Sequence, residues 1–294
     1  MPHVLKNKNL EVHVDLPFEN YDFSRFDWTG KITQVKFQDI ELTGIERADS
    51  DNVNHLGKGL YNEFGIDQGL GFDDVNPGDW FHKIGIGALK KEGANYMFSD
   101  EYQIEPAEFE TSLRPDSISI GCRSALLHGF AYFLKKEIHL SENGFSIHYH
   151  LKNTGQKSIL TNEYVHNFMA IEKRPIGKSY ILRFPFQIRP DSFEETVNPE
   201  QKATIGDREI QFNGTPQEQF FFSNLSGGEQ VQAEWELINT ESKIGIRETT
   251  DFRTDRVNLW GWKHVISPEL FYKIDLNPGE SVEWERKYSI LRTK

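Results

Sequence analysis

Apolar residues at every second position run through the chain in short stretches. From Phe145 to Leu151 they alternate with polar residues, and the same period of two recurs over Val231–Leu237 and Val282–Ile290. A period of two is typical of a strand with one buried face. Helical periodicity is scarce, so the pattern predicts an all-β fold with few and short helices.

Turn-forming residues separate these stretches. Glu142–Gly144 precedes one predicted strand, Asn153–Gly155 follows it, and Asn277–Glu280 separates the last two strands. Turns at such short intervals favour antiparallel hairpins in a large β-sandwich. The polar stretch Pro190–Gly214 is the least strand-like, and we expect a long surface excursion there. Because no repeat or Pro-rich linker is visible, residues 1–294 are expected to form one domain.

Composition narrows the range of partners and compartments. The formal net charge of −12 repels phosphate backbones and anionic membranes, so neither nucleic acid nor a membrane is expected as a partner. The only cysteine, Cys122, excludes an intrachain disulfide and favours a reducing compartment. The first residues lack the apolar core of a secretory signal, and no stretch approaches the roughly 20 apolar residues of a membrane span. These features predict a cytoplasmic protein.

Short motifs for metals, nucleotides and nucleophilic serines are absent from the sequence. There is no H-E-x-x-H, no P-loop, no G-x-S-x-G and no dinucleotide fingerprint, although Gly85 and Gly87 form an isolated G-x-G. His148 and His150 alternate onto the polar face of a predicted strand, where solvated surface histidines are the expected interpretation. We therefore expect neither a metal site nor a cofactor.

His166 stands in a motif that resembles the central part of the aldose 1-epimerases. An N-T-G type turn at Asn153–Gly155 is followed by a strand and by His166–Ile171, which matches the family pattern of a histidine, a small residue, an aromatic residue and three apolar positions. Taken alone, a histidine with apolar flanks is more often a hydrogen-bonded core residue. The resemblance implies instead that His166 is a general acid.

A second resemblance to the same family lies near the C-terminus. Family members carry a catalytic glutamate on a strand shortly before an L-x-P-G-E turn, and the turn at Leu276–Glu280 follows Glu269 at a short distance. The resemblance implies that Glu269 is the general base, whereas without it a solvated carboxylate is an equal alternative. The short spacing resembles the hexose-6-phosphate branch more than the galactose mutarotases.

A third segment, Gly57–Phe64, resembles the family's G-R-x-x-N-R-I sequence. Asn62 aligns with the asparagine, but Glu63 stands where a sugar-binding arginine is expected, which argues against galactose itself as the sugar. Further on, His82 or Lys83 occupies the place of the family's second histidine, and the sequence does not decide between the two.

Aromatic and basic residues beside these motifs complete the candidate binding site. Trp260 and Trp262 come just before Glu269 and could stack on the apolar face of a sugar, with core packing as the alternative. Arg25 lies in a loop between two predicted strands, where it could reach a sugar hydroxyl or pair with Asp27 or another acid.

Together the resemblance implies a galactose mutarotase-like β-sandwich that interconverts sugar anomers. Opening a pyranose ring needs a base for the anomeric hydroxyl and an acid for the ring oxygen, here Glu269 and His166 on opposite sides of the ring. We expect both to line a cleft with His82 or Lys83, and a tryptophan at its rim. The partner would be a sugar or sugar phosphate, and the protein a monomer or homodimer. The alternatives are a non-catalytic sugar-binding protein and a polysaccharide lyase or hydrolase domain.

Overall fold

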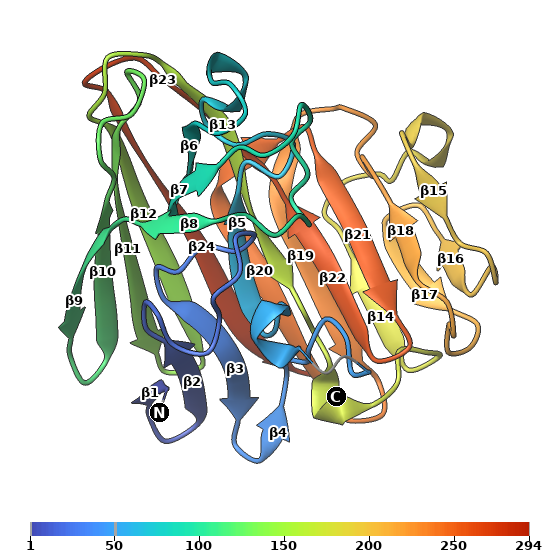
Figure 1. Ribbon diagram of the computed structural model, residues 1–294. Helices are drawn as coiled ribbons and strands as arrows, with labels where there is room; N and C mark the ends of the chain where they lie inside the picture. Colours follow the sequence, from blue (N-terminus) through green and yellow to red (C-terminus); the bar gives the residue numbers. More distant parts are fainter. Residues whose placement is uncertain (1, 50–51, 294) are drawn as a thin grey trace.

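The computed structural model describes residues 2–49 and 52–293, and strands account for nearly all of its regular structure (Figure 1). Every strand pairing in this part of the chain is antiparallel. The prediction of an all-β fold is therefore confirmed. The helices described are single 3-10 turns, and none is long and apolar enough to cross a membrane. They are η1 (Val53–His55), η2 (Phe72–Asp74), η3 (Ile171–Lys173) and η4 (Pro190–Ser192).

A ten-stranded sheet forms the larger layer of the molecule (Figure 1). Its central strands are the longest, and their alternation of apolar and polar residues turns one face toward the core. In spatial order its strands are β16 (Ala203–Ile205), β17 (Glu209–Phe212), β14 (Tyr180–Arg183), β19 (Val231–Asn239), β20 (Ile244–Thr254), β24 (Ser281–Arg292), β12 (Gly144–Asn153), β11 (Tyr132–Ser141), β10 (Ser117–Arg123) and β9 (Glu108–Leu113).

A seven-stranded sheet packs over this layer, and one apolar core takes side chains from both. Two smaller sheets complete the second layer (Figure 1). The seven strands are β1 (His3–Lys6), β2 (Leu10–Asp15), β3 (Lys31–Phe37), β4 (Ile40–Glu41), β5 (Leu60–Phe64), β13 (Ile159–Asn167) and β23 (Tyr272–Leu276). The small sheets are β15 (Thr196–Val197), β18 (Phe220–Phe222), β21 (Val257–Trp262) and β22 (Val265–Leu270), and β6 (Trp80–Lys83), β7 (Gly87–Lys90) and β8 (Ile104–Pro106).

The structure confirms the predicted strand over Phe145–Leu151 and the turn before it. In β12, Phe145, Ile147, Tyr149 and Leu151 are buried while the residues between them are at least partly exposed. The turn before β12 closes a hairpin with β11, because Ser141 pairs with Gly144. The alternation thus sets both the register and the buried face of this strand.

Arg286 occupies an apolar register position of β24 and is fully buried between the two layers. Its guanidinium donates to Glu163 on β13 and to Glu248 on β20, at 2.7 Å in each case. Each of these carboxylates is fully buried as well. Because a buried charge is tolerated only when it is paired and hydrogen-bonded, this network fixes β13 of one layer against β20 and β24 of the other.

The expectation of a long surface excursion over Pro190–Gly214 is wrong in part. The segment contains three short strands: β15 extends the four-stranded sheet, and β16 and β17 form the hairpin at the edge of the ten-stranded sheet. Strands of two to four residues are too short to give a recognisable period of two.

Candidate functional site

Strand register brings His166 and Glu269 together. Met169, just beyond β13, exchanges both backbone hydrogen bonds with Ile266 of β22, at 2.9 and 3.0 Å. Because the two strands run antiparallel, the residue three positions before Met169 faces the residue three positions after Ile266. These residues are His166 and Glu269, and the imidazole Nε2 lies 3.3 Å from the carboxylate Oε1.

The pair lies at a cavity of about 500 Å³, which is within the usual size of a small-molecule site. Strands β13, β18, β21 and β22 form its wall, together with the loops that follow β2, β4 and β7. Charged, amide and aromatic side chains converge on it, as expected of a site for a small polar ligand. Its lining residues are Arg25, Glu46, Arg47, Ile66, Phe98, Ser99, Tyr164, His166, Glu195, Gln219, Phe221, Arg256, Asn258, Trp260 and Glu269.

Aromatic rings enclose the imidazole of His166. Phe168 stacks on it with ring centres 4.0 Å apart, and Trp260 meets it edge-on at 5.3 Å. Its Nδ1 is buried and has no hydrogen-bond partner, so an imidazolium would leave one N–H unsatisfied. Burial, reinforced by the positive charge of Arg25, lowers the pKa of His166 well below its ordinary value. The imidazole is therefore neutral at neutral pH.

The pKa of Glu269 shifts in the opposite direction. Burial raises the pKa of its carboxyl to about 8, against a smaller lowering by Arg25 and Arg256. The carboxyl consequently holds a proton at neutral pH beside a neutral imidazole. A protonated carboxyl beside a neutral imidazole offers one proton donor and one proton acceptor, and general acid–base catalysis requires both.

The contact distance corrects one expectation. A separation of 3.3 Å between Nε2 and Oε1 leaves no room for a sugar ring between His166 and Glu269. The two groups therefore face the cavity from one side instead of lying on opposite sides of a ring.

A buried network supports the pair from the core side. Asn167 points away from the cavity, and its Nδ2 donates to the carbonyl of Pro268 at 2.8 Å and to Glu248 at 3.1 Å. Glu248 is held in turn by Arg286. The residues next to His166 and Glu269 are thus tied to each other and to the ten-stranded sheet, which limits movement of the pair.

Arg25 brings a guanidinium to the cavity from the loop after β2. Its Nε donates to Glu63 and its Nη1 to Glu46, both at 3.0 Å. The rings of Phe26 and Phe98 lie 4.4 and 4.6 Å from its central carbon. Arg25 therefore pairs with acids other than Asp27, and Asp27 binds Lys136 instead.

Two candidates from the third motif lie behind the cavity wall. Glu63 is fully buried and faces Arg25 instead of the cavity. Asn62 points to the other face of β5, where its amide group bonds Lys136, Tyr149 and Glu163.

The expectation that His82 or Lys83 lines the cavity is not met. The Nε2 of His82 is 3.1 Å from the backbone carbonyl of Phe130, and the ring is buried there. Lys83 is buried behind the wall with its Nζ 3.1 Å from Glu63. Of the two tryptophans, Trp260 lines the cavity, whereas the indole N–H of Trp262 donates outside it to the carbonyl of Gln217 at 2.6 Å.

Sequence reasoning missed several residues of the cavity. Asn258 pairs with Glu269 in the ladder between β21 and β22, and it alternates with Trp260 on one strand face. Tyr164 alternates in the same way with His166 on β13. The period-two spacing of Asn258 from Trp260 and of Tyr164 from His166 could have identified both residues from the sequence. Glu195 lies in the stretch that the sequence assigned to the surface, and nothing in the sequence connects it with the site.

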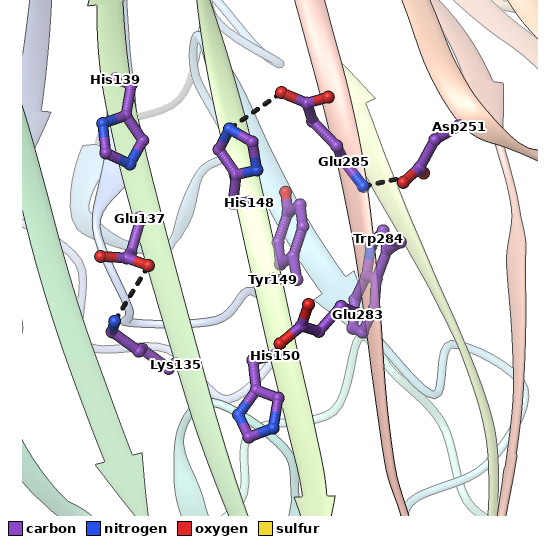
Figure 2. Close-up of a pocket in the computed structure, with 10 residues that line it drawn as sticks. All are labelled: Lys135, Glu137, His139, His148, Tyr149, His150, Asp251, Glu283, Trp284 and Glu285. Carbon is purple, nitrogen blue, oxygen red and sulfur yellow. Dashed lines mark hydrogen bonds and ion pairs between the residues drawn. The ribbon is translucent and has the colours of Figure 1, made fainter.

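A second hollow, of about 300 Å³, lies on the outward face of β11, β12 and β24 (Figure 2). His148 is 2.8 Å from Glu285, and Lys135 is 2.9 Å from Glu137, so these charges are paired within the hollow. His148 and His150 therefore lie on the polar outer face, as their alternation predicts. Among the described residues, no three or more histidine, cysteine or acidic side chains are placed to hold a metal ion.

Comparison with known proteins finds the fold but no close relative. No protein-family model and no curated protein sequence matches the chain. Solved structures do match, among them a galactose mutarotase related enzyme from Lactobacillus acidophilus (TM-score 0.60, 10% identity), a galactose mutarotase-like protein from Lactobacillus casei (0.60, 13%) and an aldose epimerase homologue from C. elegans (0.56, 12%). The alignments cover 99–100% of this chain and 98–100% of the others. The chain therefore has the galactose mutarotase-like β-sandwich fold, with a sequence that is only 10–13% identical to these proteins.

Proposed function

We propose that this protein is an aldose 1-epimerase-like enzyme that interconverts the anomers of a sugar. One observation carries the proposal: His166 and Glu269, from two different strands, lie 3.3 Å apart at a cavity of suitable size. The named relatives in fold, a galactose mutarotase related enzyme and an aldose epimerase homologue, support the same reaction class.

The reaction follows from two proton transfers. One group accepts the proton of the anomeric hydroxyl while the other protonates the ring oxygen, the bond from the anomeric carbon to the ring oxygen breaks, and a carbonyl forms. Rotation of the open chain and the reverse transfers then close the ring as the other anomer. Both oxygens are bonded to the same carbon, so adjacent groups on one side of the sugar can reach both.

The direction of the first transfer is the reverse of the sequence expectation. With its pKa raised to about 8, Glu269 begins as the acid, and the neutral His166 begins as the base. In ring opening, Glu269 gives its proton to the ring oxygen and His166 takes the proton of the anomeric hydroxyl. In ring closure, His166 protonates the carbonyl oxygen and Glu269 takes the proton of the hydroxyl that closes the ring. Over a full cycle each group therefore serves once as acid and once as base, and no further co-reactant is needed.

The charges around the cavity favour a neutral sugar over a sugar phosphate. Arg25 is paired with two carboxylates, Arg256 donates to Asp67 at 2.7 and 3.2 Å, and Arg47 lies 3.4 Å from Asp49. A phosphate would have to compete with the acids already paired with Arg25 and Arg256. Trp260 and Phe221 offer apolar faces on which a sugar ring can pack.

The test is anomer exchange measured by polarimetry or NMR exchange spectroscopy on freshly dissolved aldoses, with the spontaneous rate subtracted. Glu269→Gln and His166→Asn should each reduce the rate by ~10²–10⁴. The double variant should be little slower than either single one, because the two groups act as a unit. A wild-type protein that binds an aldose without accelerating its exchange would instead be a sugar-binding protein.

The remaining features of the proposal concern the protein as a whole. We propose a single domain over residues 1–294, a cytoplasmic location, and action as a monomer or homodimer without a cofactor. A thermal-shift screen against aldoses and sugar phosphates identifies the sugar, because a ligand that binds only the native state raises its apparent stability.

A further inference from the structure

Glu63 is a fully buried carboxylate that the reaction does not use, and both of its oxygens are occupied. Oε2 accepts from the Nε of Arg25 at 3.0 Å and from the hydroxyl of Tyr164 at 2.8 Å. Oε1 accepts from the Nζ of Lys83 at 3.1 Å. Because Glu63 is fully buried and does not line the cavity, it can affect a ligand only through its neighbours.

The orientation of Arg25 depends on these contacts. Its guanidinium carbon lies over the rings of Phe26 and Phe98, and a guanidinium forms its hydrogen bonds in its own plane, through its N–H groups. Glu63 takes the Nε–H and Glu46 takes one Nη1–H. Of the five N–H groups of an arginine, those not taken by acids or by Tyr164 remain for the cavity.

Lys83 and Tyr96 hold Glu63 in place from the far side. The Nζ of Lys83 also donates to the hydroxyl of Tyr96 at 2.7 Å and to the carbonyl of Gly65 at 3.2 Å. Lys83 is itself buried, so its charge and that of Glu63 each require the other. The result is a buried row of alternating charges, Lys83, Glu63 and Arg25, that ends at the cavity.

We propose that Glu63 is a positioning residue that fixes the guanidinium of Arg25 at the cavity, where Arg25 hydrogen-bonds the sugar. This inference rests on the proposed function for the identity of the ligand. It assigns the role of Lys83 as well, which is to balance the charge of Glu63 from behind the wall. The charge of Arg25 also lowers the pKa values of both His166 and Glu269, so its position affects this pair.

Glu163 provides a matched control for a variant of Glu63. Both are fully buried glutamates bonded to an arginine, and that arginine keeps a second carboxylate in each case: Glu46 for Arg25, and Glu248 for Arg286. Glu163 differs in pointing toward the core between the layers. Glu63→Gln and Glu163→Gln therefore remove the same charge from equally buried places, one beside the cavity and one away from it.

The first readout is the KM for mutarotation of freshly dissolved D-glucose and D-galactose. In Glu63→Gln the KM should rise about tenfold to a hundredfold, the range for losing a hydrogen bond made by a charged group, with a smaller change in kcat. In Glu163→Gln the KM should change far less than in Glu63→Gln, because Glu163 does not contact Arg25. The double variant Glu63→Gln with Lys83→Met removes the unpaired lysine as well, so it keeps the test possible if Glu63→Gln alone does not fold.

The second readout needs no sugar. It is the NMR cross-peak of the Arg25 Nε–H, identified by its absence in Arg25→Lys, together with its exchange with solvent. We expect slow exchange in the wild type and in Glu163→Gln, and fast exchange in Glu63→Gln and in the double variant. A folded Glu63→Gln or double variant with slow exchange and wild-type KM would overturn the inference. Should the wild type lack mutarotation activity, the proposed function fails, and the Arg25 cross-peak alone decides the positioning role.

Discussion

Replacing Glu269 by glutamine should change how the stability of the protein depends on pH. Burial raises the pKa of the carboxyl from 4.5 to about 8, so between these values the folded state holds a proton that the unfolded state has released. Stability therefore falls as pH rises across this window and levels off above it. The window spans about 3.5 pH units at about 1.36 kcal/mol each, which gives a loss of roughly 5 kcal/mol at most.

Glu269→Gln keeps the shape of the side chain and has no such proton. Urea unfolding of wild type and variant, from about pH 5 to about pH 9, gives the difference between their free energies of unfolding at each pH. That difference should move by several kcal/mol against the wild type as pH rises. A difference that stays constant would mean that Glu269 is ionised throughout, and its assignment as the initial acid would be wrong.

Glu200 provides a control, because its pKa is shifted in the direction opposite to that of Glu269. Backbone N–H groups of Glu218 and Gln217 lower the pKa of its carboxyl. Such a group stabilises the folded state above its unfolded pKa and loses that contribution as pH falls through its folded pKa. The difference between wild type and Glu200→Gln should therefore change only in the acid range, below the window in which Glu269 acts.

Three further predictions concern the reaction and the packing around it. The value of kcat/KM should fall above about pH 8, where Glu269 loses its proton, and again in acid, well below the ordinary imidazole pKa, where His166 gains one; a profile flat across pH 8 would contradict this. Trp260→Ala should raise KM about tenfold with little effect on kcat, since roughly 1.4 kcal/mol of ring contact is lost; unchanged KM for every bound sugar would exclude contact. Gly57→Ala should cost about 1–3 kcal/mol of stability in urea unfolding and slow the reaction, because its Cβ would lie 2.3 Å from the phenyl ring that stacks on His166. Gly93→Ala, with open space around it, should do neither.

Much of the fold could be predicted because its signals are local. The alternation over Phe145–Leu151 and the turn before it are properties of neighbouring residues, and they fix a strand, its buried face and a hairpin. The strands within Pro190–Gly214 could not be predicted in this way, since β15 and β17 are held by pairing with strands outside this stretch, and β16 pairs only with β17. Tertiary pairing, and not periodicity, makes them strands.

The site shows the same limit more sharply. His166 and Glu269 could be named from short motifs, but their separation depends on a register between strands about a hundred residues apart. Lys83 was expected in the sugar site because the sequence shows that its side chain is charged but not where it points. Its true partner, Glu63, comes from another sheet, and such a pairing emerges only when the sheets pack.

Anomer exchange itself is the most direct test of the account. NMR exchange spectroscopy on freshly dissolved aldoses compares the wild type with the double variant that carries Glu269→Gln and His166→Asn, at a pH below 8 where Glu269 holds its proton. For at least one aldose that raises the thermal stability of the protein, the wild type should exchange anomers faster than buffer, and the double variant should fall by ~10²–10⁴ toward the spontaneous rate. Exchange at the spontaneous rate with wild-type protein, for every aldose that it binds, would contradict the central claim.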